Sequence, residues 1–366
     1  MSKYFLIAGE ASGDLHAAEL IKQIQLRDPN AQIAGLGGDR MEASGCQLYR
    51  HIRHMAFMGF AAVLSHWRDV QDNFRIAKEA LLNEKPDVLI LIDYPSFNLR
   101  MAAFCKQHLP QTKIIYYIPP KVWAWKRRRV HQIARLCDEV LGIFPFEPAF
   151  YAQYGYNCRY VGNPTAEELA RLHQPILADK PMIAILPGSR PSEITNCLPR
   201  MLEAARRFSD YQIVVCAAPN IEDDFYTSYL RANETLTRDT YGAVQQASAA
   251  VVNSGTATLE TALLGCPQVA VYHLASSKLI GLIRWAQPLL FSIPYFTLVN
   301  IIAGKEVIKE CVANTFTTEN VAAELSRLLS DEAYKKEMLA SYEHLVQLLG
   351  SQPASVTAAE IITSKR

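Results

Sequence analysis

An acidic and a basic residue, each placed just after a buried apolar run, are the strongest candidates for chemistry in this chain. The run Val88–Ile92 ends at Asp93, and the run Met182–Leu186 ends in the sequence LPGSRPSE, which carries Arg190. A carboxylate at a strand end can act as a general base when burial raises its pKa above the ordinary value of about 3.9. A capping role for Asp93 in the turn before Pro95 is the alternative.

The turn around Arg190 has the residue types of an anion site. Gly188 permits a tight turn, Ser189 and Arg190 follow it, and Pro191 is typical of the first residue of a helix. The backbone N–H groups of a helix N-terminus and a guanidinium both favour a diphosphate. An ordinary strand–helix corner with a surface arginine is the alternative.

A second segment of the C-terminal half repeats this pattern. The apolar run Ala249–Val252 is followed by NSGTATLE, in which Ser254, Gly255 and Thr256 lead into a helix and offer further N–H donors to an anion. Glu260 lies about a turn into that helix, where its carboxylate can accept hydrogen bonds from a ribose diol. A surface position for Glu260 is the alternative.

The first apolar run, Tyr4–Ala8, leads into the sequence GEASGD. Gly9 and Gly13 permit a close backbone turn, and Ser12 is suited to be the N-cap of the following helix. The pattern GxGxxG is absent, so the segment indicates a nucleotide fingerprint only loosely. A capped strand–helix turn without a ligand is the alternative.

Two segments favour contact with lipid or with other anionic material. Trp123 and Trp125 precede the consecutive cations Lys126–Arg129, which suits a boundary between apolar and anionic groups, although tryptophans in a core remain open. The stretch Leu279–Ala303 carries Arg284 as its only formal charge and is long enough to cross a bilayer. Its prolines and polar residues favour a surface-lying segment over a span, with a buried helix pair as the alternative.

The composition sets broad limits. A chain of 366 residues is suited to two domains of about 150–200 residues each. Lys and Arg total 37 against 36 for Asp and Glu, which gives a formal net charge of +1. The chain therefore lacks the excess of positive charge that is typical of nucleic-acid-binding proteins. The 8 cysteines lack CxxC and zinc-ligand spacing, so we expect reduced thiols of a cytoplasmic protein, no metal and no cofactor.

Apolar runs alternate with helical patterns along the whole chain, which predicts parallel sheets covered on both faces. The expected strands are Tyr4–Ala8, Ile33–Leu36, Val88–Ile92, Ile114–Ile118, Val140–Phe144, Tyr160–Val161, Ile183–Leu186, Gln212–Cys216, Ala249–Val252 and Gln268–Tyr272. The expected helices include Leu15–Leu26 and Val70–Leu82. We predict an α/β protein of two Rossmann-like domains, 1–166 and 182–345, with a polar linker between them and a C-terminal helix in 346–366 that packs on either domain. A ligand is expected in the cleft where the strand ends converge.

Taken together, these segments resemble the lipid-A-disaccharide synthase family, glycosyltransferase family 19 of the GT-B class. The matching motifs run in family order over most of the chain: GEASGD (Gly9–Asp14), GLGGDRM (Gly35–Met41), MGF (Met58–Phe60), PDVLILIDYPSFN (Pro86–Asn98), YYIPPKVWAWKRRRV (Tyr116–Val130), FPFE (Phe144–Glu147), LPGSRPSE (Leu186–Glu193), NSGTATLE (Asn253–Glu260) and NIIAGKEV (Asn300–Val307). Ser96, Lys121 and the tail after Val307 depart from the family pattern.

The resemblance implies two Rossmann-like domains that face a central cleft, and it implies roles for particular residues. The family's essential Asp falls on Asp93, and its essential Arg falls on Arg190. The remaining residues that it implies in substrate binding are Gly9, Ser12, Gly13, Asn98, Trp123, Gly188, Ser189, Ser254, Gly255, Thr256, Glu260 and Asn300. The departures at Ser96 and Lys121 bear on the acceptor and not on the reaction class.

The implied reaction is an inverting transfer from UDP-2,3-diacylglucosamine to 2,3-diacylglucosamine 1-phosphate. It forms a β-1,6-linked lipid A disaccharide 1-phosphate and UDP, with Asp93 as the base and Arg190 at the leaving group. Acylated substrates imply peripheral association with the inner face of the inner membrane, through Met55–Trp67, Leu279–Ala303 and nearby cations. We expect no nucleic-acid partner, and a homodimer is left open. The alternatives are another UDP-sugar enzyme, such as a 2-epimerase, and a non-catalytic binding protein.

Overall fold

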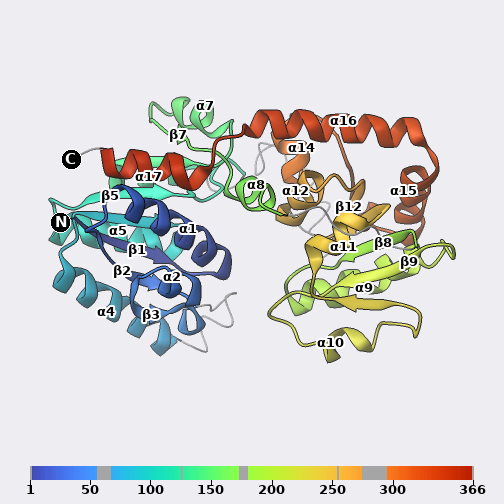
Figure 1. Ribbon diagram of the computed structural model, residues 1–366, viewed down its shortest axis with the longest axis horizontal. Helices are drawn as coiled ribbons and strands as arrows, with labels where there is room; N and C mark the ends of the chain where they lie inside the picture. Colours follow the sequence, from blue (N-terminus) through green and yellow to red (C-terminus); the bar gives the residue numbers. More distant parts are fainter. Residues whose placement is uncertain are drawn as a thin grey trace. The chain divides into compact units, whose positions relative to one another are not determined.

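A computed structural model describes residues 2–55, 67–124, 127–172, 180–253, 255–273 and 295–364 of the chain. The chain divides into two units (Figure 1). Unit 1 comprises Met1–Glu167 together with Gly350–Arg366, and unit 2 comprises Glu168–Leu349. Most of unit 1 is therefore drawn in blue and green, with the red C-terminal helix added to it.

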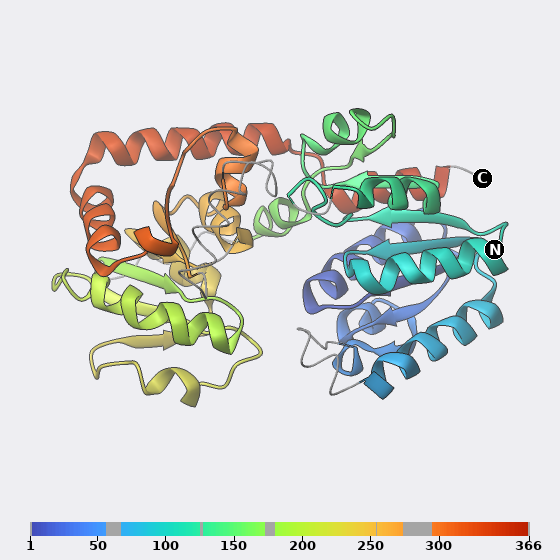
Figure 2. The ribbon, with the colours of Figure 1, turned by 180° about the vertical axis from the view of Figure 1, so that it is seen from behind.

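Unit 1 is a parallel sheet with helices on its two faces (Figures 1 and 2). Its elements are β1 (Lys3–Ala8), α1 (Ala11–Arg27), β2 (Gln32–Gly37), α2 (Asp39–Ala43), β3 (Gln47–His51), η1 (Ile52–His54), α4 (Trp67–Glu84), β4 (Val88–Ile92), α5 (Pro95–His108), β5 (Lys113–Tyr117), α6 (Arg129–Leu136), β6 (Glu139–Gly142), α7 (Glu147–Ala152), β7 (Arg159–Tyr160), α8 (Pro164–Leu169), which crosses the unit boundary, and α17 (Ala354–Ser364).

The 7-stranded sheet of unit 1 has the order β3-β2-β1-β4-β5-β6-β7. The order reverses between β1 and β4, whose last residues Ala8 and Ile92 are register partners. In doubly wound sheets, ligands bind beyond the carboxyl ends of the two strands at such a reversal. The topology therefore brings the GEASGD segment and Asp93 to the same edge of one sheet.

Unit 2 repeats the same architecture. Its elements are β8 (Met182–Leu186), α9 (Pro191–Ala205), β9 (Gln212–Cys216), α10 (Asp224–Thr227), β10 (Thr235–Thr237), α11 (Thr240–Gln246), β11 (Ala249–Val252), α12 (Gly255–Leu263), β12 (Gln268–Tyr272), α14 (Leu298–Ala303), β13 (Lys309–Val312), η2 (Ala313–Thr315), α15 (Thr318–Ser330) and α16 (Glu332–Leu349). The 6-stranded sheet has the order β10-β9-β8-β11-β12-β13, and Leu186 pairs with Val252 at the reversal between β8 and β11.

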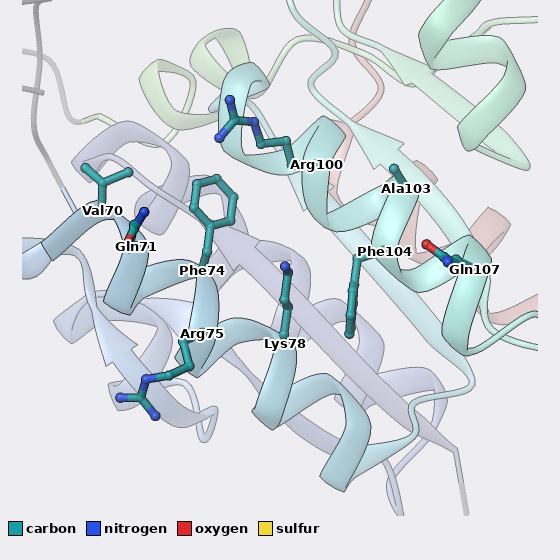
Figure 3. A pocket seen from close by; sticks show the side chains of 9 residues that line it. All are labelled: Val70, Gln71, Phe74, Arg75, Lys78, Arg100, Ala103, Phe104 and Gln107. Carbon is teal, nitrogen blue, oxygen red and sulfur yellow. The ribbon is translucent and has the colours of Figure 1, made fainter. Parts of the chain in front are cut away.

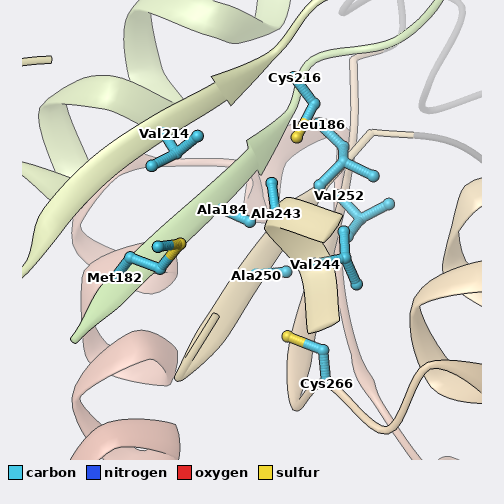
Figure 4. Packing of buried hydrophobic residues seen from close by; sticks show 10 residues of the cluster. All are labelled: Met182, Ala184, Leu186, Val214, Cys216, Ala243, Val244, Ala250, Val252 and Cys266. Atoms are coloured by element: carbon cyan, nitrogen blue, oxygen red, sulfur yellow. The ribbon is translucent and has the colours of Figure 1, made fainter. Parts of the chain in front are cut away.

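The core under the second sheet fixes these strand ends. Alternate residues of β8, β9 and β11 pack with α11 and with Cys266 in one buried cluster (Figure 4). The members are Met182, Ala184, Leu186, Val214, Cys216, Ala243, Val244, Ala250, Val252 and Cys266. Successive strand residues point to opposite faces, so a one-residue slip of a strand would turn its members of this cluster to the other face of the sheet. The packing therefore locks the register that aligns Leu186 with Val252.

The C-terminal segment returns to unit 1. Helix α16 runs without a break through residue 345 to Leu349, and the following segment belongs to unit 1 from Gly350 onward. Helix α17 packs on α1, where Arg27 and Glu360 form an ion pair of 3.0 Å. The backbone N–H of Ser355 also donates a hydrogen bond of 2.9 Å to the Glu167 carboxylate.

The predicted α/β architecture of two Rossmann-like sheets is confirmed, and every strand expected from the sequence is present. The sequence prediction missed β3, β10 and β13, which lie at the edges of the sheets. Within the described ranges, none of the helices combines the length and apolar character that are needed to cross a bilayer. Most of the stretch Leu279–Ala303 lies outside those ranges.

Candidate active site

Asp93 stands on a strained turn directly after β4. Asp93 and Tyr94 have φ values of 46° and 45°, a left-handed conformation that residues other than glycine seldom adopt. The Asp93 N–H donates to the Ile118 carbonyl at 3.2 Å, and the Asp93 carbonyl accepts from Tyr116 Oη at 2.8 Å. Such strain persists where its surroundings enforce it, and it is concentrated at functional sites.

The environment of Asp93 meets the condition for a general base. The side chain is half-buried, and this burial raises the pKa of the carboxyl above its ordinary value. The positive charge of Lys121 acts in the opposite direction and lowers the pKa. A carboxylate whose pKa is raised in this way is a stronger base than a solvated aspartate.

Asn98 supports the Asp93 turn. Its side chain is fully buried in α5, and Nδ2 donates to the Asp93 carbonyl at 2.7 Å and to the Ile92 carbonyl at 3.2 Å. The amide nitrogen therefore holds the backbone of the turn, and the predicted contact of Asn98 with the substrate stays a prediction. Its place is that of a positioning residue.

The GEASGD segment packs against the same turn. A Cβ atom at Gly9 would lie 2.3 Å from the Tyr94 ring, so only glycine allows this close approach. Helix α1 begins at Ala11 after Glu10 with no side-chain cap, so the prediction of Ser12 as the N-cap is wrong. Ser12 is exposed in the first turn of the helix, and Gly13 is buried beneath it.

Asp14 has a role that the sequence did not indicate. Its buried carboxylate accepts hydrogen bonds from the N–H groups of Gly38 at 2.7 Å, Met41 at 3.1 Å and Arg40 at 3.1 Å. These are the free donors at the N-terminus of α2, so Asp14 caps that helix from another part of the chain. This contact ties the GEASGD and GLGGDRM motifs together.

Trp123 lies in the core of unit 1. Its side chain is 3% exposed, and Nε1 donates to Glu147 Oε1 at 3.1 Å. The other oxygen of Glu147 accepts from the N–H groups of Ile143 at 2.7 Å and Phe144 at 2.9 Å. Burial raises the pKa of Glu147 to about 7. These contacts hold the Trp123 side chain in the core, and its predicted contact with substrate stays a prediction. Trp125 and Lys126 lie outside the described residues.

In unit 2, the PGSR turn is held by contacts with Glu193. Gly188 has a φ of 110°, and a Cβ atom there would lie 2.7 Å from Glu193 Oε2. The same oxygen accepts from the Ser189 N–H at 3.1 Å. Arg190 is the N-cap residue of α9, and its side chain, 58% exposed, lies 3.2 Å from Glu193 Oε1. The helix N-terminus and the guanidinium therefore stand together as predicted from their spacing.

The second anion segment is joined to the first by Asn253. Its Nδ2 donates to the Pro187 carbonyl at 2.8 Å, and its N–H donates to the Leu186 carbonyl at 2.8 Å. Helix α12 then begins at Gly255, and Thr256 in its first turn is exposed. Ser254 lies outside the described residues. Asn253 is thus a positioning residue that sequence reasoning did not single out.

Glu260 lies half-buried in α12. Burial is the main cause that raises its pKa to about 7, and the charge of Glu168 adds to it. A carboxyl group in this state can share hydrogen bonds with hydroxyl groups as acceptor or donor. Its surroundings therefore fit the predicted ribose contact better than the alternative of a solvated surface glutamate.

Asn300 lies in the interior of unit 2. Its Oδ1 accepts from the N–H groups of Val307 at 2.7 Å and Ile308 at 3.0 Å, and its Nδ2 donates to Glu310 Oε1 at 3.0 Å. The side chain is 0% exposed. The amide thus holds the turn that follows α14, and the predicted contact of Asn300 with substrate stays a prediction. Across the described ranges, no group of 3 or more His, Cys, Asp or Glu residues is placed to hold a metal ion.

Comparisons with known proteins agree with this arrangement. The family model described as Lipid-A-disaccharide synthetase matches residues 4–363. A lipid-A-disaccharide synthase of Myxococcus xanthus is 36% identical over 376 residues, covering 98% of this chain and 96% of that protein. A lipid-A-disaccharide synthase of Geobacter sulfurreducens is 33% identical over 376 residues, with the same coverage of 98% and 96%.

Solved structures share the fold at low sequence identity. A UDP-GlcNAc 2-epimerase from Neisseria meningitidis bound to UDP-GlcNAc has a TM-score of 0.69 at 11% identity, covering 99% of this chain and 100% of that one. A MurG from Acinetobacter baumannii has a TM-score of 0.57 at 15% identity, covering 100% of both chains. The architecture is that of GT-B proteins. The sequence relatives go further than the fold, and the chain belongs to the lipid-A-disaccharide synthase family of glycosyltransferases, which act in lipid A biosynthesis.

Proposed function

We propose that the protein transfers 2,3-diacylglucosamine from UDP-2,3-diacylglucosamine to 2,3-diacylglucosamine 1-phosphate with inversion at the anomeric carbon. The products are the β-1,6-linked disaccharide 1-phosphate and UDP. This proposal rests mainly on the positions of two charged residues at the strand reversals of the two sheets. Asp93 follows β4 in unit 1, and Arg190 follows β8 in unit 2. Family membership supports the same reaction.

Unit 1 is proposed to supply the base and to bind the acceptor. Asp93 takes the proton from the acceptor 6-hydroxyl as that oxygen attacks the anomeric carbon of the donor. The bond between that carbon and the diphosphate oxygen breaks, and UDP leaves with the electron pair. The raised pKa of Asp93 suits proton transfer from a hydroxyl, and the hydrogen bonds from Asn98 and Tyr116 hold the Asp93 turn in place.

Unit 2 is proposed to bind UDP and to stabilise its departure. Arg190 and the N–H groups of the Gly188–Ser189 turn face the growing negative charge, with the N-termini of α9 and α12 contributing their dipoles. Glu193 pairs with Arg190 and accepts a hydrogen bond from the Ser189 N–H, so the diphosphate must compete with this carboxylate for both donors. Glu260 is proposed to bind the ribose.

The acylated substrates lead us to propose peripheral association with the inner face of the inner membrane. Arg68 and the Arg127–Arg128 pair are exposed on unit 1 and can attract anionic lipid. Arg53 and Arg75, which the sequence also suggests for this role, are paired with carboxylates: Arg53 with Asp39, and Arg75 with Asp72 and Glu79. Partition of the protein with anionic vesicles at low and high salt tests the association, and absence from the lipid fraction at every salt concentration contradicts it.

A direct assay tests the reaction itself. The purified protein is incubated with the acylated UDP-sugar and the acylated 1-phosphate acceptor, and UDP and disaccharide are measured by chromatography and mass spectrometry. The proposal predicts equal amounts of both products, formed only when both substrates are present. Turnover of unacylated UDP-N-acetylglucosamine without an acceptor would instead favour an epimerase.

A further inference from the structure

A groove lies between α4 and α5 on unit 1, apart from the residues of the proposed active site (Figure 3). It has a volume of about 720 Å³. Helix α4 contributes Val70, Phe74 and Lys78, which are four residues apart and therefore share one helix face. Helix α5 contributes Arg100 and Phe104, which also share a face. The groove thus combines two aromatic rings with two cations.

Lys78 and Arg100 each lie over an aromatic ring of the opposite helix. Lys78 Nζ on α4 is 5.2 Å from the centre of the Phe104 ring, and Arg100 Cζ on α5 is 5.2 Å from the centre of the Phe74 ring. These cation–π contacts hold both charged groups at the groove and leave them exposed to solvent. The two positive charges are therefore presented together, one from each helix.

Two of the three cations that line the groove have no ion-pair partner among the residues that the structure describes. No carboxylate of those residues lies within ion-pair distance of Lys78 or Arg100. Arg75, which also borders the groove, is different, since it pairs with Asp72 at 2.6 Å and with Glu79 at 3.0 Å. Two uncompensated cations beside apolar rings have the chemistry that recognises an anionic headgroup joined to hydrocarbon.

The aromatic floor of the groove continues toward the active site. Phe74 stacks on Phe97 with ring centres 4.4 Å apart, and the Phe97 ring lies 5.5 Å from the ring of Tyr94, the residue after Asp93. A lipid held in the groove would therefore lie against the same packed aromatic layer that supports the Asp93 turn.

We infer that the groove between α4 and α5 binds the phosphate headgroup of an anionic membrane phospholipid through Lys78 and Arg100, with the adjoining hydrocarbon against Phe74 and Phe104. A membrane lipid is the occupant that fits, because α4 follows directly on residues 56–66, a mostly apolar sequence without Asp, Glu, Lys or Arg. The inference rests on the proposed membrane association and assigns it a specific site.

Sedimentation of the full-length protein with lipid vesicles tests this site, without any sugar substrate. Vesicles of phosphatidylcholine alone are compared with vesicles that also contain phosphatidylglycerol. The variant Lys78→Gln/Arg100→Gln is expected to bind the anionic vesicles about 25-fold more weakly than the unmodified protein, because each juxtamembrane cation contributes a factor of about 5. The control Arg207→Gln/Lys336→Gln removes two exposed cations of unit 2 and is expected to bind normally.

Further control experiments distinguish loss of the lipid site from misfolding and from failure of the proposed reaction. The charge-preserving variant Lys78→Arg/Arg100→Lys should retain binding to anionic vesicles, and a thermal melt reports whether each variant is folded. Equal binding by the Gln variant and the unmodified protein would overturn the inference, as would complete displacement by soluble glycerol phosphate. UDP release from detergent-dispersed substrates should be unchanged in the Gln variant. If the unmodified protein releases no UDP from these substrates, the proposed reaction is contradicted and the lipid site is not.

Discussion

At the residue scale, the candidate site depends on side chains that hold other groups in place. The places of Asp93 and Arg190 in the fold could be predicted, because Asp93 directly follows the apolar strand β4 and Arg190 comes shortly after the apolar strand β8. The contacts that support them could not be predicted: Asn98 and Tyr116 bond the Asp93 carbonyl, and Asn253 bonds the Pro187 carbonyl. The bonds of Tyr116 and Asn253 join residues that only the folded sheet brings together, whereas that of Asn98 depends on the geometry of the turn before α5. For the same reason, spacing alone could not distinguish a ligand contact from a buried support.

Lys121 is predicted to tune the base. Its charge lowers the pKa of Asp93, so Lys121→Ser should raise that pKa and move the acid limb of the kcat/KM profile to higher pH. The shift should shrink as salt screens the exposed ammonium. Lys106→Ser, which removes another exposed cation of unit 1 that pairs with Asp138, should leave the profile in place. A Lys121→Ser profile that coincides with that of the unmodified enzyme would contradict this role.

Glu147 is predicted to make stability depend on pH. Its pKa in the folded protein, about 7, is above the ordinary value of 4.5. The folded state therefore binds the Glu147 proton more tightly than the unfolded state does. The contribution of this proton to the free energy of unfolding is complete below pH 4.5 and is lost as the pH rises through 7. The side chain of Glu147→Gln stays neutral at every pH. In urea titrations, the free energy of unfolding of this variant should therefore fall less over that range than that of the unmodified protein. Parallel pH dependences for the two proteins would contradict the assignment.

At the element scale, the fold could be predicted where strands are buried on both faces. The central strands read as continuous apolar runs, because helices cover both sides of each sheet. The edge strands β3, β10 and β13 are short or carry polar and charged residues that lie partly in solvent. Their sequences lack the apolar run, so the pattern could not distinguish them from loops.

The turn between β8 and α9 is predicted to require glycine. Gly188→Ala places a Cβ atom 2.7 Å from Glu193 Oε2 in a backbone with φ of 110°, which costs on the order of 1–3 kcal/mol and displaces the Ser189 N–H. UDP affinity, measured by calorimetry, should fall by about tenfold or more if 1.4 kcal/mol or more of this cost falls on binding.

Gly265→Ala provides the matched control, because Gly265 has a φ of 75° and a methyl group added there would meet no heavy atom within 4 Å. This variant should lose some stability and keep its UDP affinity. Equal affinities for UDP in the Gly188→Ala and unmodified proteins would show that the turn does not bind the diphosphate.

At the scale of the whole molecule, the chain builds two sheets of the same topology and returns its last helix to the first of them. The sequence motifs lie at the strand reversals of both sheets, so the proposed reaction draws on residues of both units. The C-terminal helix could be predicted as a helix, but its partner could not, because α17 packs on α1 across more than three hundred residues of sequence.

Helix α17 is predicted to stabilise unit 1. Ile362 is 3% exposed on this helix, and Ile362→Ala should lower the free energy of unfolding by about 2–5 kcal/mol. If the two units unfold in separate transitions, the loss of stability should appear in the unfolding transition of unit 1. Thr363→Ala, a smaller change on the same helix, should cost much less. Urea titration of both variants measures the difference, and equal stabilities would contradict the packing of α17.

The central claim is that Asp93 and Arg190 carry out one glycosyl transfer to an acylated acceptor. The most direct measurement is UDP and disaccharide formation from the two acylated substrates by the unmodified protein, Asp93→Asn and Arg190→Ala. Loss of a general base should lower kcat by about 10²–10⁴-fold, and loss of the cation should lower it by about 10²–10³-fold. Near-normal turnover by both variants would contradict the account.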